Sequence, residues 1–276
     1  MKIKKLIKKV LFKIFKKNIS TVPILVNHQK MLENKIAMIT GGDSGIGYAI
    51  AEEFIKNGCK VIICGRDKKK LEKCSNKLGE YCKYIELDVR DINKMKKVIE
   101  MAATLFDENR IDILVNSAGI GVKHSFFNID EEEYDLIMDV NAKGTFFMTK
   151  EMANYMIDKK IKGHILNVSS SSALRPAWTP YEMSKWSIKG FTLGAADTLA
   201  KYGITVNAIA PGPTATPMLN VKEGDNIAID TNLVGRYAMP NEIASLAVYM
   251  CSEMGRMIVG DTFYITGGAG NIINRF

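Results

Sequence analysis

Short apolar runs alternate with longer helix-like stretches from residue 35 to residue 265 of this 276-residue chain. The runs are typical of buried strands and lie at residues 35–40, 60–64, 82–87, 111–115, 163–168, 204–209 and 261–265. The stretches between them predict helices at residues 46–57, 67–78, 91–107, 130–159, 181–201 and 240–252. Alternation of strand and helix predicts a single α/β domain, whose mostly parallel, seven-stranded sheet has helices on both faces.

A different pattern occupies residues 1–17, where eight lysines accompany no acidic residue. The apolar positions recur at three- and four-residue steps, which predicts a helix with one apolar face: Ile3, Leu6, Ile7, Val10, Leu11 and Ile14. An in-plane helix on an anionic membrane surface fits this pattern, and so does a solvated or partner-packed extension. We favour peripheral membrane contact. Residues 18–33 are expected to be a linker, and residues 34–276 the catalytic domain.

Composition narrows the class of protein. The hydrophobic content of 47% and charged content of 25% are ordinary for a globular enzyme. The net charge of +8 resides in residues 1–17, because the rest of the chain has 30 basic and 30 acidic residues, so nucleic-acid binding is not indicated. Five cysteines without a C-x-x-C pair favour free thiols in the cytoplasm. The three histidines are scattered, so no metal is expected.

Glycines at the first strand-to-helix turn indicate a phosphate site. Residues 40–47 read Thr-Gly-Gly-Asp-Ser-Gly-Ile-Gly. Free N–H groups at a helix N-terminus bind phosphate, and glycine lets the backbone approach it. At this place in an alternating chain, the glycines predict dinucleotide binding. The alternative is a tight turn that uses glycine only for its positive φ.

Two Tyr-x3-Lys pairs are candidates for proton transfer: Tyr181 with Lys185, and Tyr155 with Lys159. Residues four apart share a helical face, and an ammonium lowers the pKa of a neighbouring phenol. Such a phenol exchanges a proton near neutral pH. The spacing alone leaves both pairs open, and the second pair precedes the fifth strand. Tyr181 opens the helix that follows a serine-rich strand end.

These motifs together resemble the short-chain dehydrogenase/reductase family, in its compact single-domain, 3-oxoacyl reductase-like form. The resemblance covers residues 34–270 and rests on an ordered set: Thr40 to Gly47, Leu87-Asp88-Val89, Asn116-Ser117-Ala118-Gly119, Val140-Asn141, Asn167-Val168-Ser169-Ser170, Tyr181 to Lys185, and Pro211-Gly212 with Thr216. It implies a Rossmann-type, doubly wound fold and interconversion of a ketone and a secondary alcohol by hydride transfer.

The same resemblance implies residue roles. Tyr181 would be the acid/base, and Lys185 would lower its pKa and hold the nicotinamide ribose. Tyr155, which has no strand-end serine just upstream, would be a packing or surface residue. Ser170 would polarise the carbonyl, with Ser169 as second choice among four consecutive serines. Asn141 would hold a water that relays protons through Lys185. Ser170 and Tyr181 are eleven residues apart, about two fewer than is usual in the family. We expect the catalytic geometry to survive this shortening.

Cofactor contacts are implied at the strand ends: Thr40, Gly41, Asp43, Ser44, Gly45, Ile46, Gly47, Arg66, Asp88, Val89, Asn116, Ala118, Gly119, Tyr181, Lys185, Pro211, Gly212, Thr214 and Thr216. The second strand ends at Gly65 followed by Arg66. A small residue and then an arginine suit a ribose 2′-phosphate, so we prefer NADP(H). Asp67, and the lack of a basic residue at Ser44, keep NAD(H) as the alternative.

The substrate is a small carbonyl or alcohol compound that the sequence does not identify. Trp178, Met183, Met218 and Leu219 indicate a partly apolar pocket, or ordinary lid packing. A 3-oxoacyl thioester, a sugar, a polyol or a steroid would each fit the resemblance. Two other hypotheses are a binding protein on a retired reductase scaffold and a sugar epimerase or dehydratase, although relatives of the latter kind are longer. The resemblance also implies a homodimer or homotetramer.

Overall fold

The computed structural model describes residues 30–222 and 224–270, so the predicted helix at residues 1–17 lies outside the described residues. Seven parallel strands form one sheet in the order β3-β2-β1-β4-β5-β6-β7. They are β1 (Ile36–Thr40), β2 (Lys60–Gly65), β3 (Cys82–Glu86), β4 (Ile113–Asn116), β5 (His164–Val168), β6 (Thr205–Pro211) and β7 (Thr262–Ile265). The strand order reverses between β1 and β4, which is where sheets of this kind bind ligands.

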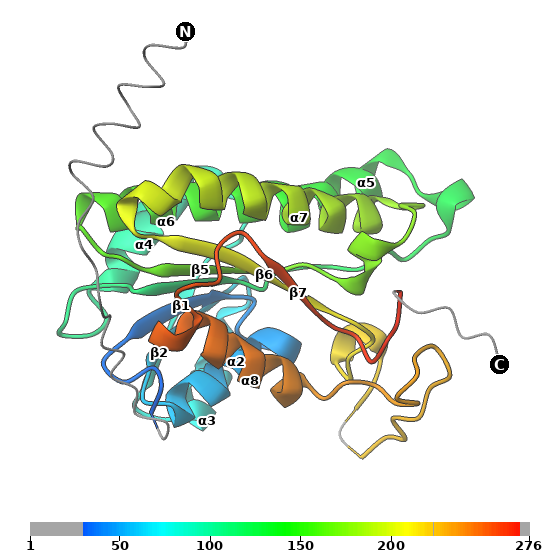
Figure 1. Cartoon of the computed structure of the whole chain (residues 1–276), viewed down its shortest axis with the longest axis horizontal. Coiled ribbons are helices and arrows are strands. Elements are labelled where there is room, and N and C mark those ends of the chain that lie inside the picture. The colour runs from blue at the N-terminus through cyan, green and yellow to red at the C-terminus, as the bar shows by residue number, and fades with distance from the viewer. Residues whose placement is uncertain (1–29, 223, 271–276) are drawn as a thin grey trace, which may run out of the picture.

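Helices cover both faces of the sheet (Figure 1). One layer contains α4 (Ile92–Ala103), α5 (Glu131–Met138), α6 (Gly144–Asp158) and α7 (Pro180–Leu199), and the opposite layer contains α2 (Gly45–Lys56), α3 (Lys68–Leu78) and α8 (Pro240–Cys251). The predicted doubly wound, single-domain fold is therefore confirmed. Among the described residues, no helix is long and apolar enough to cross a membrane.

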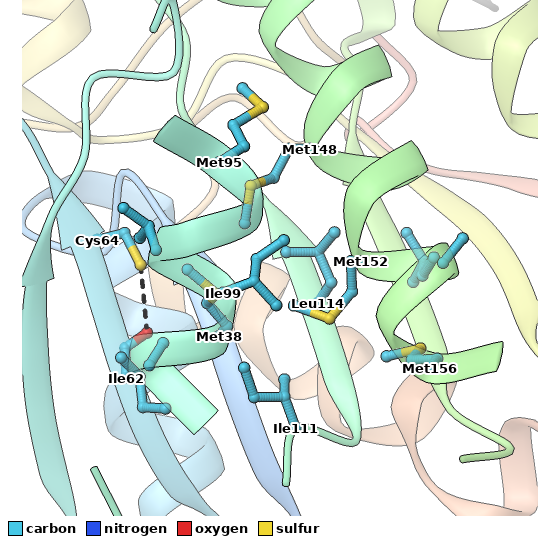
Figure 2. Close-up of a cluster of buried hydrophobic side chains, with 14 of the residues drawn as sticks. Met38, Ile62, Cys64, Met95, Ile99, Ile111, Leu114, Met148, Met152 and Met156 are labelled. Atoms are coloured by element: carbon cyan, nitrogen blue, oxygen red, sulfur yellow. Dashed lines mark hydrogen bonds between the residues drawn. The ribbon is translucent and has the colours of Figure 1, made fainter. Parts of the chain in front are cut away.

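The core is rich in methionine where the sheet meets α4 and α6. Met38 on β1 and Leu114 on β4 face Ile99 of α4 and Met148 and Met152 of α6 (Figure 2), and all five are fully buried. A second cluster lies on the other face, against α2 and α8. Because both faces are covered, the strands carry nearly continuous apolar runs rather than alternating ones.

The predicted strands are correct to within two residues, but the long helix predicted at residues 130–159 is interrupted. A π-helical turn at Asp139–Lys143 joins α5 to α6. Such turns have no simple sequence signal and often mark functional sites. Leu32, within the predicted linker, is fully buried against the core, and its N–H donates a 3.0 Å hydrogen bond to the carbonyl of Asn57.

Candidate active site

A cleft of about 340 Å³ lies at the carboxyl ends of the central strands, within the usual size range of small-molecule sites. Most of the predicted site residues line it: Gly41, Asp43, Ser44, Gly45, Ile46, Gly47, Arg66, Asp88, Val89, Ala118, Gly119, Ser170, Tyr181, Lys185, Pro211, Gly212, Thr214 and Thr216. The structure thus brings the glycine turn and the Tyr181–Lys185 pair into one cleft. Thr40, Asn116 and Asn141 are not among its lining residues.

The glycine turn at the start of α2 fits a pyrophosphate. Gly41 has a φ of +65° and passes so close to the next loop that a Cβ there would lie 2.9 Å from the backbone nitrogen of Ala118. A Cβ on Gly47 would collide with the carbonyl oxygen of Gly41. The N-cap residue Ser44 makes no side-chain hydrogen bond to the helix. The first N–H groups of α2 therefore lack a side-chain cap and face the cleft, as an anion site requires.

Thr40 and Asn116 hold neighbouring segments together rather than lining the cleft. The hydroxyl oxygen of Thr40 accepts hydrogen bonds of 3.2 Å from the backbone N–H groups of Ser117 and Ala118. The amide of Asn116 is buried and donates to Thr149 and Asn167 at 2.9 Å each. Both residues hold loops beside the glycine turn, and a cofactor contact by either of them stays a prediction.

Local capping sets the position of Tyr181. The Thr179 N–H donates to the Glu182 carboxylate at 3.0 Å, the Thr179 hydroxyl bonds the same carboxylate, and Pro180 occupies the first turn of α7. This capping box starts the helix immediately before Tyr181. The loop upstream, between β5 and α7, contains a 3₁₀ turn at Ser171–Leu174.

The ammonium of Lys185 is buried and donates a 2.9 Å hydrogen bond to the carbonyl of Val168, at the end of β5. The Ser169 hydroxyl donates to the carbonyl of Lys185 at 3.0 Å, which fastens α7 to the same strand end. Burial lowers the pKa of Lys185 to about 8, because removal from water disfavours the charged form. The group therefore titrates near physiological pH.

The pKa of Tyr181 departs from our expectation. Burial raises it above the ordinary value, and a hydrogen bond with Ser170 lowers it by a smaller amount. We expected Lys185 to lower this pKa, but the Lys185 Nζ atom lies 5.7 Å from the centre of the tyrosine ring and is bonded to Val168 instead. Tyr181 is consequently protonated at neutral pH and is available as a proton donor.

Asn141 lies in the π-helical turn and is fully buried. Its Oδ1 accepts from the Ile120 N–H at 2.9 Å, and its Nδ2 donates to the Ile120 carbonyl at 3.0 Å and to the Ser184 hydroxyl at 3.1 Å. The side chain therefore joins the loop after β4 to α7, one residue before Lys185.

The second Tyr-x3-Lys pair is structural. Tyr155 packs against the core from α6, and neither it nor Lys159 lines the cleft. Trp178 and Met183 do not line the cleft either, and their side chains are 55% and 43% exposed. Met218 and Leu219 do line it, as expected.

The charged lining residue that was not predicted is Lys70, in the first turn of α3. It is the last of three consecutive lysines, Lys68 to Lys70, so composition does not single it out. Its position just after the end of β2 is the available signal, because that strand end lies beside the ribose site in folds of this type.

Comparison with known proteins identifies relatives over most of the chain. A family model described as short chain dehydrogenase matches residues 35–226. The galactitol 2-dehydrogenase of Agrobacterium fabrum is 36% identical over 252 residues, which cover 86% of this chain and 98% of the relative.

Two solved structures resemble the fold closely. The 3-ketoacyl-(acyl-carrier-protein) reductase of Brucella melitensis complexed with NADH is 32% identical, with a TM-score of 0.79 over 87% of this chain and 99% of that one. A variant of the actinorhodin polyketide ketoreductase with NADPH is 27% identical, with a TM-score of 0.78 over 86% and 98%.

Proposed function

This chain belongs to the short-chain dehydrogenase family, and we propose on that basis that it reduces a ketone to a secondary alcohol with Tyr181 as the proton donor. Membership makes it a dehydrogenase or reductase with a nicotinamide cofactor. The observation that carries the finer proposal is the meeting of Ser170, Tyr181 and Lys185 in one cleft with the glycine turn.

The proposed chemistry divides between cofactor and protein. The reduced nicotinamide, when bound, supplies the hydride that reaches the carbonyl carbon. Ser170 and Tyr181 donate hydrogen bonds to the carbonyl oxygen, and the Tyr181 proton passes to that oxygen as charge develops on it. A buried ammonium at Lys185 stabilises the phenolate that remains. Asn141 holds the loop and helix that carry these groups and, in the proposal, a water that returns a proton through Lys185.

The glycine turn and the first N–H groups of α2 would hold the pyrophosphate, since they are uncapped by side chains and reach the cleft. We propose NADP(H) as the preferred cofactor. Arg66 lines the cleft beside Gly65, which has no side chain to repel a phosphate. Arginine binds phosphate through charge-assisted hydrogen bonds.

The substrate end of the cleft favours an uncharged ketone. The charged side chains among the lining residues are Asp43, Arg66, Lys70, Asp88 and Lys185. The first four follow β1, β2 or β3, away from Tyr181, and Ile120, Met218 and Leu219 add apolar surface. The ketone group of a 3-oxoacyl thioester is uncharged and is compatible with these lining residues. A polyol is the second candidate, because a galactitol dehydrogenase is a relative.

A panel assay tests the proposal. The full chain is mixed with NADPH and an acetoacetyl thioester, a keto sugar or a ketosteroid, or with NADP and the matching alcohols, and absorbance at the nicotinamide band is followed. We expect turnover with the thioester above the others. Turnover only with a polyol and its ketose would replace the thioester proposal, and cofactor binding without turnover on any compound would favour a binding protein.

A further inference from the structure

The end of β2 has no acidic side chain, yet a carboxylate lies beside it. A Cβ built on Gly65 would be 3.4 Å from the Cγ and 3.5 Å from the Oδ1 of Asp43. Asp43 belongs to the glycine turn, and its side chain is 14% exposed. It therefore places a carboxylate beside the strand end where dinucleotide folds use an acid to accept the ribose hydroxyls.

Asp67, the nearest acidic residue in sequence, serves another purpose. It is the N-cap of α3, and its carboxylate accepts a 3.0 Å hydrogen bond from the Lys70 N–H. Asp67 does not line the cleft, whereas Asp43 does. The carboxylate beside the carboxyl end of β2 therefore comes from Asp43, in the loop after β1, rather than from the loop after β2.

Lys70 covers this carboxylate. Its Nζ lies 3.0 Å from the Asp43 Oδ2, and its side chain is 47% exposed at the cleft. One helical turn later, the Cys74 thiol donates to the Asp43 carbonyl at 3.4 Å. Helix α3 therefore fixes Asp43, while the half-exposed ammonium keeps room to move. Arg66 lines the same cleft, so Asp43, Lys70 and Arg66 together carry a net charge of +1.

We propose that Asp43 and Lys70 form the cofactor selector of this chain, an inference that rests on the proposed cofactor-dependent function. Toward a ribose with free hydroxyls, Asp43 is the hydrogen-bond acceptor. Toward a ribose 2′-phosphate, Lys70 turns from Asp43 to the phosphate, which Arg66 also contacts. The chain then accepts both cofactors, and Lys70 sets the preference by masking a carboxylate that would repel the phosphate.

The test measures binding rather than turnover. Fluorescence titration gives Kd for NADPH and NADH, and competition with adenosine 2′,5′-bisphosphate and with ADP isolates the ribose subsite. The variants are Lys70→Met and Asp43→Asn, with Lys69→Met as the control, because Lys69 is exposed on the same helix and does not line the cleft. For wild type we expect both cofactors to bind, NADPH more tightly.

Lys70→Met should shift the ratio of NADPH to NADH affinity at least tenfold toward NADH, and Asp43→Asn should shift it several-fold toward NADPH. Lys69→Met should leave the ratio within twofold. A shift in Lys70→Met without one in Asp43→Asn would make Lys70 an ordinary phosphate ligand and refute the paired selector. An unchanged ratio in both variants refutes the inference alone, and wild type that binds neither cofactor refutes the proposed function with it.

Discussion

The Lys185 ammonium donates its 2.9 Å hydrogen bond to the carbonyl of Val168 rather than to a carboxylate. Its positive charge is buried without an ionic partner among the described residues. Removing a charge from water is costly unless it is paired. The lysine that serves catalysis in the proposed function is therefore a source of instability in the folded chain.

Lys185→Met should stabilise the protein while abolishing turnover. The native pKa of about 8 lies below the ordinary 10.5, so the unfolded state binds more protons between those pH values, and wild-type stability rises with pH across that window. The advantage of the methionine variant should be largest below pH 8, at up to about 3 kcal/mol, and should shrink toward pH 10.5. Urea denaturation from pH 6 to 10 measures this difference in the free energy of unfolding.

Lys159→Met is the control for this prediction, because Lys159 is exposed. The control should show no such trend with pH. A trend shared by both variants would contradict the assignment of the pH dependence to the buried Lys185.

Asn141→Ala should weaken both the fold and the reaction. The change removes three hydrogen bonds and leaves the N–H and carbonyl of Ile120 without their partner, which costs about 1–3 kcal/mol. We also expect kcat to fall at least tenfold and its pH profile to shift, because Ser184 loses its link to the π-helical turn. An unshifted profile with a purely lower stability would leave Asn141 a structural residue only.

Two glycine substitutions should act in opposite directions. Gly47→Ala places a methyl group against the Gly41 carbonyl, so it should destabilise the fold by about 1–3 kcal/mol and abolish NADPH binding. Gly190→Ala, on α7 with nothing within 4 Å, should stabilise by about 0.5–1 kcal/mol, since alanine favours the helix. Thermal unfolding with a binding titration checks both. Equal effects would contradict the close approach inferred at the glycine turn.

Leu193→Asp should alter the oligomeric state. Leu193 and Trp186 are seven residues apart and share one face of α7, and Phe146 of α6 packs against the same helix, its ring 5.0 Å from that of Phe191. These three apolar side chains are 63%, 42% and 44% exposed. We expect light scattering to show a dimer or tetramer for wild type and a smaller species for the variant. Met101→Asp, on α4, is the control, and a monomeric wild type would remove the basis for an interface here.

The fold was predictable because its information is local. Apolar runs and helical stretches placed every strand of the sheet to within two residues, and glycines located the first turn. The details of the site depend on longer-range packing. Three such details arise from residues that folding brings together: the π-helical turn at Asn141, the salt bridge from Lys70 to Asp43, and the burial that raises the Tyr181 pKa. No spacing in the sequence predicts them.

The role of Tyr181 is tested most directly by comparing Tyr181→Phe with Tyr155→Phe in NADPH-dependent reduction of the best ketone from the panel. Loss of the phenol proton should lower kcat about 100-fold or more at Tyr181, with the NADPH Kd and the unfolding midpoint nearly unchanged. Tyr155→Phe should keep wild-type turnover, since its hydroxyl is buried in the core and has no partner among the described residues. Turnover by Tyr181→Phe at the wild-type rate would contradict the proposed mechanism.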